Sequence, residues 1–309
     1  MQRDGRPTVR RGFVSIAVVC LASCSGPGTA PAPIPADTAA LTPSTSAPIG
    51  PPATFVGAGD IADCNTQGSE LTARLLDVIG GTVFTTGDNA YPGGTAEEFR
   101  RCYSPTWGRH LARTRPTPGN HDYNVPNGAA YFGYFGANAG PYGLGYYSYD
   151  LGTWHVISLN SEIDVRPGSP QERWLREDLA ANRTRCTIAY WHRPLFSSGH
   201  GAHAEIRPIW RALYDADVDV VLNGHDHYYE RFAPQDPDGR IDATRGLRQF
   251  VIGTGGATIR RPAMSAANSE ASGYEWGVVQ FTLEPGSYRW EFVPAAGSTF
   301  RDSGTGTCH

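Results

Sequence analysis

Alternation of short β-rich runs with helical patterns is the feature that most constrains what this chain can fold into. Runs 54–59 and 82–86 are rich in β-branched and aromatic residues, and the segment 69–79 between them has helical periodicity. Thr95 and Glu98 form a capping box, which predicts a further helix start. The same patterns predict later strands at 145–151, 154–160, 186–191 and 218–222 and helices at 170–181 and 204–214.

The end of the chain changes character. It contains three more strand candidates, at 249–253, 276–283 and 287–293, and we expect them to complete the edge of a sheet. No repeat period and no second linker interrupt residues 54–309. The pattern therefore predicts one α/β domain over 54–309, with mixed sheets and helices outside them.

Polar residues of the metal-ligand type recur where the predicted strands end. A single Asp or His in such a place is usually a turn former or a structural residue. Ligand sites of open α/β sheets collect at the carboxyl ends of strands, so one site explains all of these segments together. The segments are Asp60, Gly87-Asp88-Asn89-Ala90-Tyr91, Gly119-Asn120-His121-Asp122, Trp191-His192 and Gly224-His225-Asp226-His227.

The mixture of residue types in these segments suits a pair of metal ions. Carboxylate and amide oxygens suit a strongly charged ion, and imidazoles suit a divalent transition metal. A carboxylate such as Asp88 can bridge two ions about 3.5–4 Å apart, and such a pair binds phosphate and activates water. The sequence therefore predicts a two-metal hydrolytic site.

The first 24 residues have the layout of an export signal. Four arginines precede an apolar run at 13–22 that is too short to span a bilayer of about 30 Å. Leu21-Ala22-Ser23-Cys24 resembles a bacterial lipobox, which predicts a lipid anchor at Cys24, and Arg10-Arg11 is also compatible with the twin-arginine route. Simple cleavage near Ala22, with secretion, is the alternative.

Residues 25–53 are rich in Pro, Ala, Thr, Ser and Gly, which predicts a flexible linker. Such a linker would hold a catalytic domain away from a membrane surface. The net charge of −4 argues against nucleic acid as a partner, because no basic excess exists to neutralise a phosphate backbone. The oligomeric state has no signature in the sequence.

Four cysteines lie in the predicted domain, an even number that in an exported chain indicates two disulfides. Three pairings are open, and we favour Cys64 with Cys102 and Cys186 with Cys308, because the first pair would join two loops beside the site. A four-cysteine zinc site is the alternative, but no close CxxC spacing supports it.

Taken in order, these segments resemble the calcineurin-like metallophosphoesterase superfamily over nearly all of residues 54–309. The resemblance implies a four-layer α/β/β/α sandwich. Most members have a ligand His two residues after the first Asp, where this chain has Ala62. Tyr91, three residues after Asp88, instead resembles the purple acid phosphatases, whose tyrosinate binds ferric iron.

The resemblance implies a role for each ligand. Asp60, Tyr91 and His227 would hold Fe(III), Asp88 would bridge, and a divalent ion, which is Zn(II), Mn(II) or Fe(II), would have the ligands Asn120, His192 and His225. A metal-bound hydroxide would attack a phosphomonoester of a small molecule, as in an acid phosphatase.

Four further residues are predicted to take part in catalysis. His121 would reach the leaving oxygen or a phosphate oxygen, oriented by Asp122 or by a backbone carbonyl. His200 and His203 resemble the histidines that line the substrate side in purple acid phosphatases, although a plain surface loop shaped by Gly199 and Gly201 is the alternative. Two other functions stay open: a phosphodiesterase or nucleotidase on the same scaffold, and a non-catalytic, surface-tethered binding protein.

Overall fold

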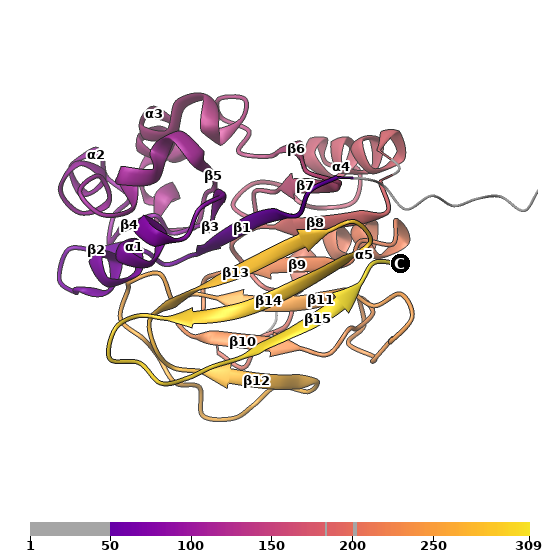
Figure 1. The fold of residues 1–309 in the computed structure, drawn as a ribbon. Helices are drawn as coiled ribbons and strands as arrows, with labels where there is room; N and C mark the ends of the chain where they lie inside the picture. The colour runs from indigo at the N-terminus through magenta and orange to yellow at the C-terminus, as the bar shows by residue number, and fades with distance from the viewer. Residues whose placement is uncertain (1–49, 183, 200–202) are drawn as a thin grey trace, which may run out of the picture. The chain divides into compact units, whose positions relative to one another are not determined.

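Two mixed β-sheets form the centre of the computed structural model, which describes residues 50–182, 184–199 and 203–309 (Figure 1). The predicted signal peptide 1–24 with Cys24, residues 25–49 of the predicted linker, and His200 lie outside the described residues. No helix in the described ranges is long and apolar enough to cross a membrane.

The first sheet combines strands from both ends of the domain. Its strands are β1 (Ala53–Ala58), β3 (Thr82–Thr86), β5 (Thr114–Thr117), β13 (Gly277–Glu284), β14 (Ser287–Pro294) and β15 (Ser303–Thr307). They lie in the order β15-β14-β13-β1-β3-β5. Strands β1, β3 and β5 pair in parallel, whereas β13, β14 and β15 pair antiparallel, so the sheet is mixed as predicted.

The second sheet is also mixed. Its strands are β6 (Tyr147–Leu151), β7 (Trp154–Ser158), β8 (Cys186–Tyr190), β9 (Val220–Asn223), β10 (Tyr229–Phe232), β11 (Arg248–Ile252) and β12 (Ser269–Gly273). They lie in the order β12-β10-β11-β9-β8-β7-β6, with β7, β8, β9 and β11 parallel. A short parallel pair, β2 (Ala62–Asp63) and β4 (Ala90–Tyr91), lies apart from both sheets.

The side chains of β8 show how the two sheets pack. The ring of Tyr190 lies 5.8 Å from that of Phe55 in β1 and 6.2 Å from that of Phe84 in β3, so this face of β8 contacts the first sheet directly. Ala189, one residue earlier, faces the other way and belongs to a separate apolar cluster. Alternation along a strand thus assigns one face to the inter-sheet core and the other to the helices.

Helices cover the outer faces and complete the four-layer arrangement that the resemblance implied. Leu175 of α4 and Trp210 of α5 pack in the cluster that contains Ala189 of β8. The helix α1 packs its Ala73 and Leu76 in the cluster that contains β1. The α-helices are α1 (Gly68–Val78), α2 (Ala96–Glu98), α3 (Ala129–Phe135), α4 (Pro170–Ala181) and α5 (Arg207–Asp215).

Short helical turns connect these elements. Thr95 does form the predicted capping box with Glu98, but α2 continues as a single π-helical stretch rather than a longer α-helix. The 204–214 helix likewise begins with a 3₁₀ turn before α5. These segments are η1 (Phe99–Tyr103, π) and the 3₁₀ turns η2 (Trp107–Arg113), η3 (Asp122–Asn124), η4 (Pro126–Gly128), η5 (Gly136–Ala139) and η6 (Ala204–Ile206).

The expectation that the three C-terminal strands complete one sheet edge is wrong. β11 lies inside the second sheet, whereas β13 lies in the middle of the first, against β1. Strand β15 was not predicted at all, because its sequence Ser-Gly-Thr-Gly-Thr has no apolar residue. Its glycines pack over large rings: a Cβ at Gly304 would lie 2.4 Å from Trp290, and one at Gly306 would lie 2.3 Å from Tyr288.

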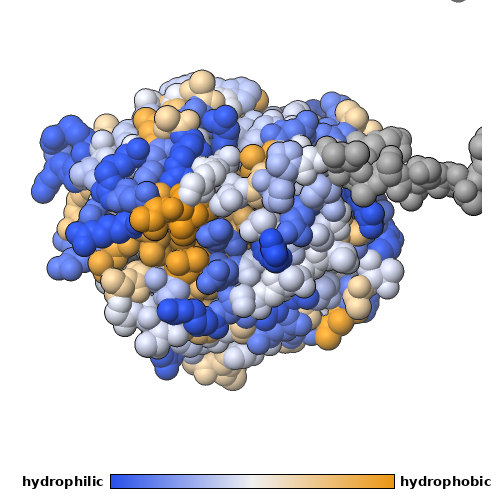
Figure 2. All heavy atoms as spheres, viewed as in Figure 1, coloured by the Kyte–Doolittle hydropathy of each residue, from blue (hydrophilic) through white to orange (hydrophobic). Residues whose placement is uncertain are grey.

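The face shown in Figure 2 is largely hydrophilic, with one compact apolar patch in the region where Figure 1 places α1. Val78, the last residue of α1, is exposed.

Candidate metal centre

All five predicted site segments follow strands of the two sheets, and Tyr91 lies in the short strand β4 that comes after Asp88. Asp60 follows β1, Asp88 follows β3 and Asn120 follows β5 of the first sheet. His192 follows β8 and His225 follows β9 of the second sheet. The strands within each of these sets are parallel, so the loops at their carboxyl ends gather at one place.

One group of three predicted ligands is centred on Tyr91. Its hydroxyl donates to Asp60 Oδ1 over 2.7 Å and lies 3.2 Å from His227 Nε2. The same nitrogen of His227 lies 3.3 Å from Asp60 Oδ1. All three side chains are buried. A phenol oxygen, a carboxylate oxygen and an imidazole nitrogen therefore converge on one point.

A second group consists of Asn120, His192 and His225. Asn120 Oδ1 lies 3.1 Å from His192 Nε2 and 2.9 Å from His225 Nδ1. The two imidazole nitrogens are 3.2 Å apart. An amide oxygen and two imidazole nitrogens thus face one another, in the combination predicted for the divalent ion.

Asp88 connects the two groups through one oxygen. Its Oδ2 accepts the Tyr91 hydroxyl over 2.9 Å and lies 3.3 Å from His192 Nε2. Candidate ligand atoms of Asp60, Asp88 and His192 lie within 4.8 Å of one another, which makes these three residues a group that can hold a metal ion. A carboxylate in contact with both groups has the position that a bridging ligand needs.

The donor chemistry of the cluster fits cations. The Nδ1 atoms of His192 and His227 lie 2.8 Å and 2.9 Å from the carbonyl oxygens of Thr86 and Thr258. Because carbonyls only accept, each neutral ring donates from Nδ1 and turns the lone pair of Nε2 into the cluster. The Nε2 atom of His192 then faces the oxygens of Asn120 and Asp88, an arrangement that a cation between these atoms would stabilise.

The pKa shifts of His192 and His225 also indicate that the cluster favours a positive charge. Burial alone lowers the pKa of His192, but the carboxylate of Asp88 outweighs it and raises that pKa to about 10. Burial and the neighbouring His192 and His203 lower the pKa of His225 to about 2. A proton on His192 and a metal ion compete for the same lone pair, because a ligating imidazole must be neutral.

In the environment of Tyr91, only a strong cation would convert the phenol to a tyrosinate. Burial, and then the carboxylates of Asp60 and Asp88, raise the pKa of its phenol well above the usual value. A bound cation is the largest local charge in such a site and reverses this preference. The residues present therefore fit an ion of high charge next to Tyr91.

Three predicted ligands have left-handed backbone conformations. Their φ angles are 58° at Asp60, 50° at Asp88 and 73° at His225. Non-glycine residues adopt this region rarely, at a cost on the order of 1–3 kcal/mol each, and such residues cluster at functional sites. The conformation turns each loop sharply after its strand and directs the side chains to a common point.

His121 lies at the edge of the cluster, with about a third of its side chain exposed. Its Nδ1 lies 2.6 Å from the Pro92 carbonyl oxygen, and its Nε2 lies 3.8 Å from Asp88 Oδ2. Of the two orienting groups expected from the sequence, the structure therefore shows the backbone carbonyl in contact with His121. The exposed side of the ring is open to a ligand.

Asp122 is fully buried and contacts the loops rather than the His121 ring. Its carboxylate accepts the Gly119 N–H over 2.9 Å and the Asn89 side-chain amide over 2.9 Å. It also accepts the Asn89 backbone N–H. These bonds connect the residue before Asn120 with the residue after Asp88. Asp122 thus sets the distance between two ligand loops.

His203 lies over His225, with the two ring centroids 4.8 Å apart. Its Nδ1 lies 3.1 Å from Glu205 Oε1, and its buried Nε2 has no hydrogen-bond partner in the part of the chain that the structure describes. Because Nδ1 donates to Glu205, Nε2 can donate to an anion only when both ring nitrogens carry protons.

Arg193 and Glu162 were not predicted as site residues. Arg193 Nε donates to Glu162 Oε1 over 2.9 Å, and one of its terminal nitrogens donates to Glu162 Oε2 over 3.0 Å. Arg193 directly follows His192 in the chain, and after burial and the neighbouring histidines its charge also lowers the pKa of His225. Its place directly after His192 was the signal in the sequence.

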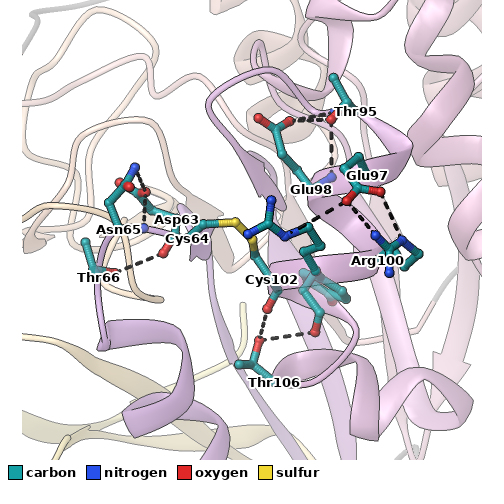
Figure 3. Close-up of a disulfide and its surroundings, with 12 residues drawn as sticks. Asp63, Cys64, Asn65, Thr66, Thr95, Glu97, Glu98, Arg100, Cys102 and Thr106 are labelled. Atoms are coloured by element: carbon teal, nitrogen blue, oxygen red, sulfur yellow. Dashed lines mark hydrogen bonds and ion pairs between the residues drawn. A yellow bond between two sulfur atoms is a disulfide. The ribbon is translucent and has the colours of Figure 1, made fainter.

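Both predicted disulfide pairings are confirmed. Cys64 bonds to Cys102 and Cys186 bonds to Cys308. Figure 3 shows the first disulfide, which joins the loop after Asp63 to the helical segment of Thr95–Cys102. Asp63 pairs with Tyr91 in the β2–β4 ladder, so this disulfide lies beside the strand that presents Tyr91.

A four-layer sandwich with carboxylate, phenol and imidazole side chains at its strand ends agrees with the metallophosphoesterase expected from the sequence. Residues 47–229 match the family described as calcineurin-like phosphoesterase. The chain therefore belongs to this family, and several of the proteins it resembles are named purple acid phosphatases.

Three known proteins illustrate what this chain is similar to. A protein of Mycobacterium tuberculosis is 32% identical over 249 residues, covering 65% of this chain and 45% of the relative. Purple acid phosphatase 21 of Arabidopsis thaliana is 30% identical over 225 residues, covering 63% of this chain and 49% of the plant protein. The fold of purple acid phosphatase PPD1 from Lupinus luteus aligns with a TM-score of 0.68 at 20% identity, over 84% of this chain and 54% of the lupin chain. This chain thus spans about half the length of these relatives.

Proposed function

We propose that this chain is an exported phosphatase that hydrolyses phosphomonoesters of small molecules at a two-metal centre. The observation that carries the proposal is the contact of one Asp88 oxygen with both Tyr91 and His192, which joins two ligand groups through a single carboxylate. Two ions held so close clamp the attacking and leaving oxygens of a phosphoryl group.

Asp60, Tyr91 and His227 would hold Fe(III), and Asn120, His192 and His225 would hold Zn(II), Mn(II) or Fe(II), with Asp88 shared between them. The ions would supply Lewis acidity toward the phosphate and a lowered pKa for water. The chain has Ala62 where a histidine ligand is expected, and Tyr91 supplies a donor instead. This exchange supports a ferric ion, because a phenolate oxygen is a hard, anionic donor.

The chain's own residues around the centre have distinct tasks in this proposal. His121, held by the Pro92 carbonyl, donates a proton to the leaving oxygen or a hydrogen bond to a phosphate oxygen. His203, as an imidazolium supported by Glu205, donates from Nε2 to the phosphate, and His200 is proposed to contact the substrate as well. Asp122 acts by positioning the loops of Asp88 and Asn120.

Export to an oxidising compartment agrees with the two disulfides. We propose that residues 1–24 direct export, that a lipid on Cys24 anchors the chain at the cell surface, and that residues 25–53 separate the anchor from the domain. Simple secretion after cleavage is the alternative. A small phosphorylated molecule, not nucleic acid, is the proposed substrate, since the net charge is −4.

The proposed activity is tested by comparing phosphomonoester and phosphodiester hydrolysis on one preparation whose metal content and visible spectrum are measured. We expect faster monoester hydrolysis, two metal ions per chain and a tyrosinate band that Tyr91→Phe removes. Preferential diester hydrolysis would establish the phosphodiesterase alternative, and a metal-loaded chain without either activity would indicate a binding protein.

The role of His121 is tested on the same substrates. His121→Ala is expected to lower kcat by about a hundredfold, the lower end of the range for loss of a general acid. His309→Ala, next to Asp219 at the chain end and remote from the cluster, is the matched control and is expected to retain full activity. Equal rates for the two variants would remove His121 from the mechanism.

A further inference from the structure

Two buried carboxylates lie directly behind the turn that carries His225 and His227, and the proposed mechanism uses neither. Asp226 lies between the two histidines, and Glu230 lies in the adjoining strand β10. Both side chains are buried, with exposures of 1% for Asp226 and 0% for Glu230. Buried carboxylates are costly unless hydrogen-bonded, so their partners are informative.

Hydroxyl groups connect the two carboxylates. The Ser197 hydroxyl donates to Asp226 Oδ2 and lies 2.8 Å from the Tyr228 hydroxyl oxygen. Tyr228 donates in turn to Glu230 Oε2 over 3.1 Å. The network therefore includes three side chains from the segment Asp226–Glu230 and one from the loop after β8.

Glu230 holds a second residue of that loop. It accepts the Ser198 backbone N–H over 2.9 Å and the Ser198 hydroxyl over 2.5 Å. Ser198 Oγ also accepts the backbone N–H of Ala266 over 2.6 Å, so a third segment is attached. A Cβ at Gly199 would lie 2.3 Å from Asp226 Oδ1, which shows how closely this loop follows the turn.

The turn itself has tight backbone bonds that transmit any displacement. The Asp226 N–H donates to the Gly224 carbonyl over 2.9 Å, and the Tyr228 N–H donates to the Asp226 carbonyl over 2.7 Å. His225, which lies between Gly224 and Asp226, has a φ of 73°. A shift of the Asp226 or Tyr228 side chain would therefore move the backbone of both histidines.

We infer that Asp226 and Glu230 are positioning residues that fix His225 and His227 for metal binding by holding the turn against Ser197 and Ser198. The inference rests on the proposed metal role of the two histidines. Partners outside the ligand set commonly change metal affinity by about 10–100-fold when they are mutated.

The test measures the dissociation constant for Zn²⁺ by competition with a chelator, together with the melting temperature. Glu230→Gln puts an amide N–H₂ against the Ser198 donors, and Ser197→Ala removes the donor to Asp226. Both variants are expected to bind Zn²⁺ at least about tenfold more weakly than the wild type. Ser197→Thr keeps the hydroxyl and is expected to restore binding.

Glu172→Gln is the matched control. Glu172 is also buried and also accepts one backbone N–H, from Gly168, and one side-chain donor, from Arg176, but it lies in α4. The Glu172→Gln variant is expected to have a lower melting temperature but unchanged Zn²⁺ binding. Wild-type Zn²⁺ affinity in both Glu230→Gln and Ser197→Ala would overturn the inference. If Glu230→Gln does not fold, the comparison of Ser197→Ala with Ser197→Thr decides alone.

This readout separates the inference from the proposed activity. A wild-type chain that binds Zn²⁺ but hydrolyses no phosphoester would refute the activity and leave the affinity comparison intact. A wild-type chain that binds no metal would overturn the positioning role.

Discussion

At the scale of single residues, the absence of a side chain at Gly119 sets how closely two ligand loops approach. A Cβ at this position would lie 2.2 Å from Asp88 Oδ1 and 2.4 Å from the Asp88 backbone nitrogen. Neither atom can retreat easily, because Oδ1 accepts the His121 N–H and the loops are joined through Asp122. The glycine is therefore required by the metal centre.

Gly119→Ala is expected to displace Asp88 and to cost about 1–3 kcal/mol of stability through overpacking. Metal content after dialysis against a chelator should fall below that of the wild type. Gly133→Ala is the control, because a Cβ there meets no atom within 4 Å, and alanine favours the helix α3. Equal metal retention in the two variants would contradict the steric argument.

Ala62 occupies the position where the resemblance led us to expect a ligand histidine. The residue is fully buried and pairs with Ala90 in the β2–β4 ladder, one position from Tyr91. The Tyr91 hydroxyl contacts Asp60 Oδ1 and Asp88 Oδ2, so this side chain reaches the shared carboxylate from the neighbouring strand. The small residue and the tyrosine are two parts of one arrangement.

At the scale of elements, the two disulfides have different tasks. Cys64–Cys102 connects residues 38 apart beside the β2–β4 pair, whereas Cys186–Cys308 connects the start of β8 to the chain end over 122 residues. The loop-closure model gives about 4 kcal/mol for the shorter loop and about 5 kcal/mol for the longer one.

Replacing each pair by serines is expected to separate these tasks. Loss of Cys186–Cys308 should lower the melting temperature more, because it releases the larger loop. Loss of Cys64–Cys102 should weaken metal binding more, because it frees the segment that pairs with Tyr91. Thermal unfolding and chelator competition on both variants measure the two effects. The reverse order in metal affinity would show that the first disulfide does not support the centre.

At the scale of the whole molecule, the metal centre joins the two sheets. Asp60, Asp88 and Asn120 come from loops of the first sheet, and His192 and His225 come from loops of the second. The backbone N–H of His225 donates to Asp60 Oδ2 over 2.8 Å across this junction. Ions held there would stabilise the packing of one sheet on the other.

Metal removal is therefore expected to destabilise the entire fold. Ligand linkage gives about 4 kcal/mol at a thousandfold excess over the dissociation constant, which corresponds to a melting-temperature loss on the order of 10 °C for a domain of this size. Calorimetry with and without chelator measures the loss, and added Zn²⁺ should restore the original value. Asp88→Asn, which lacks the shared carboxylate charge, should show a much smaller chelator effect. An unchanged wild-type melting temperature would contradict this linkage.

Although the sequence left three disulfide pairings open, it determined by itself the types of the candidate ligands and their places after strands. These features are local: Asp88 follows a β-rich run in the chain, and the structure places it after β3 as expected. The long helix 170–181 was also predictable, since Ser169 caps it and Pro170 opens it.

Only the tertiary structure decided which strands share a sheet and which carboxylates lie behind the candidate ligands and can position them. β15 exists because Gly304 and Gly306 fit over Trp290 and Tyr288, a requirement that arises only after β14 has packed. Likewise, Glu230 meets Ser198 across 32 residues of chain. Contacts of this kind depend on the final packing of distant segments, which no local pattern of residues encodes.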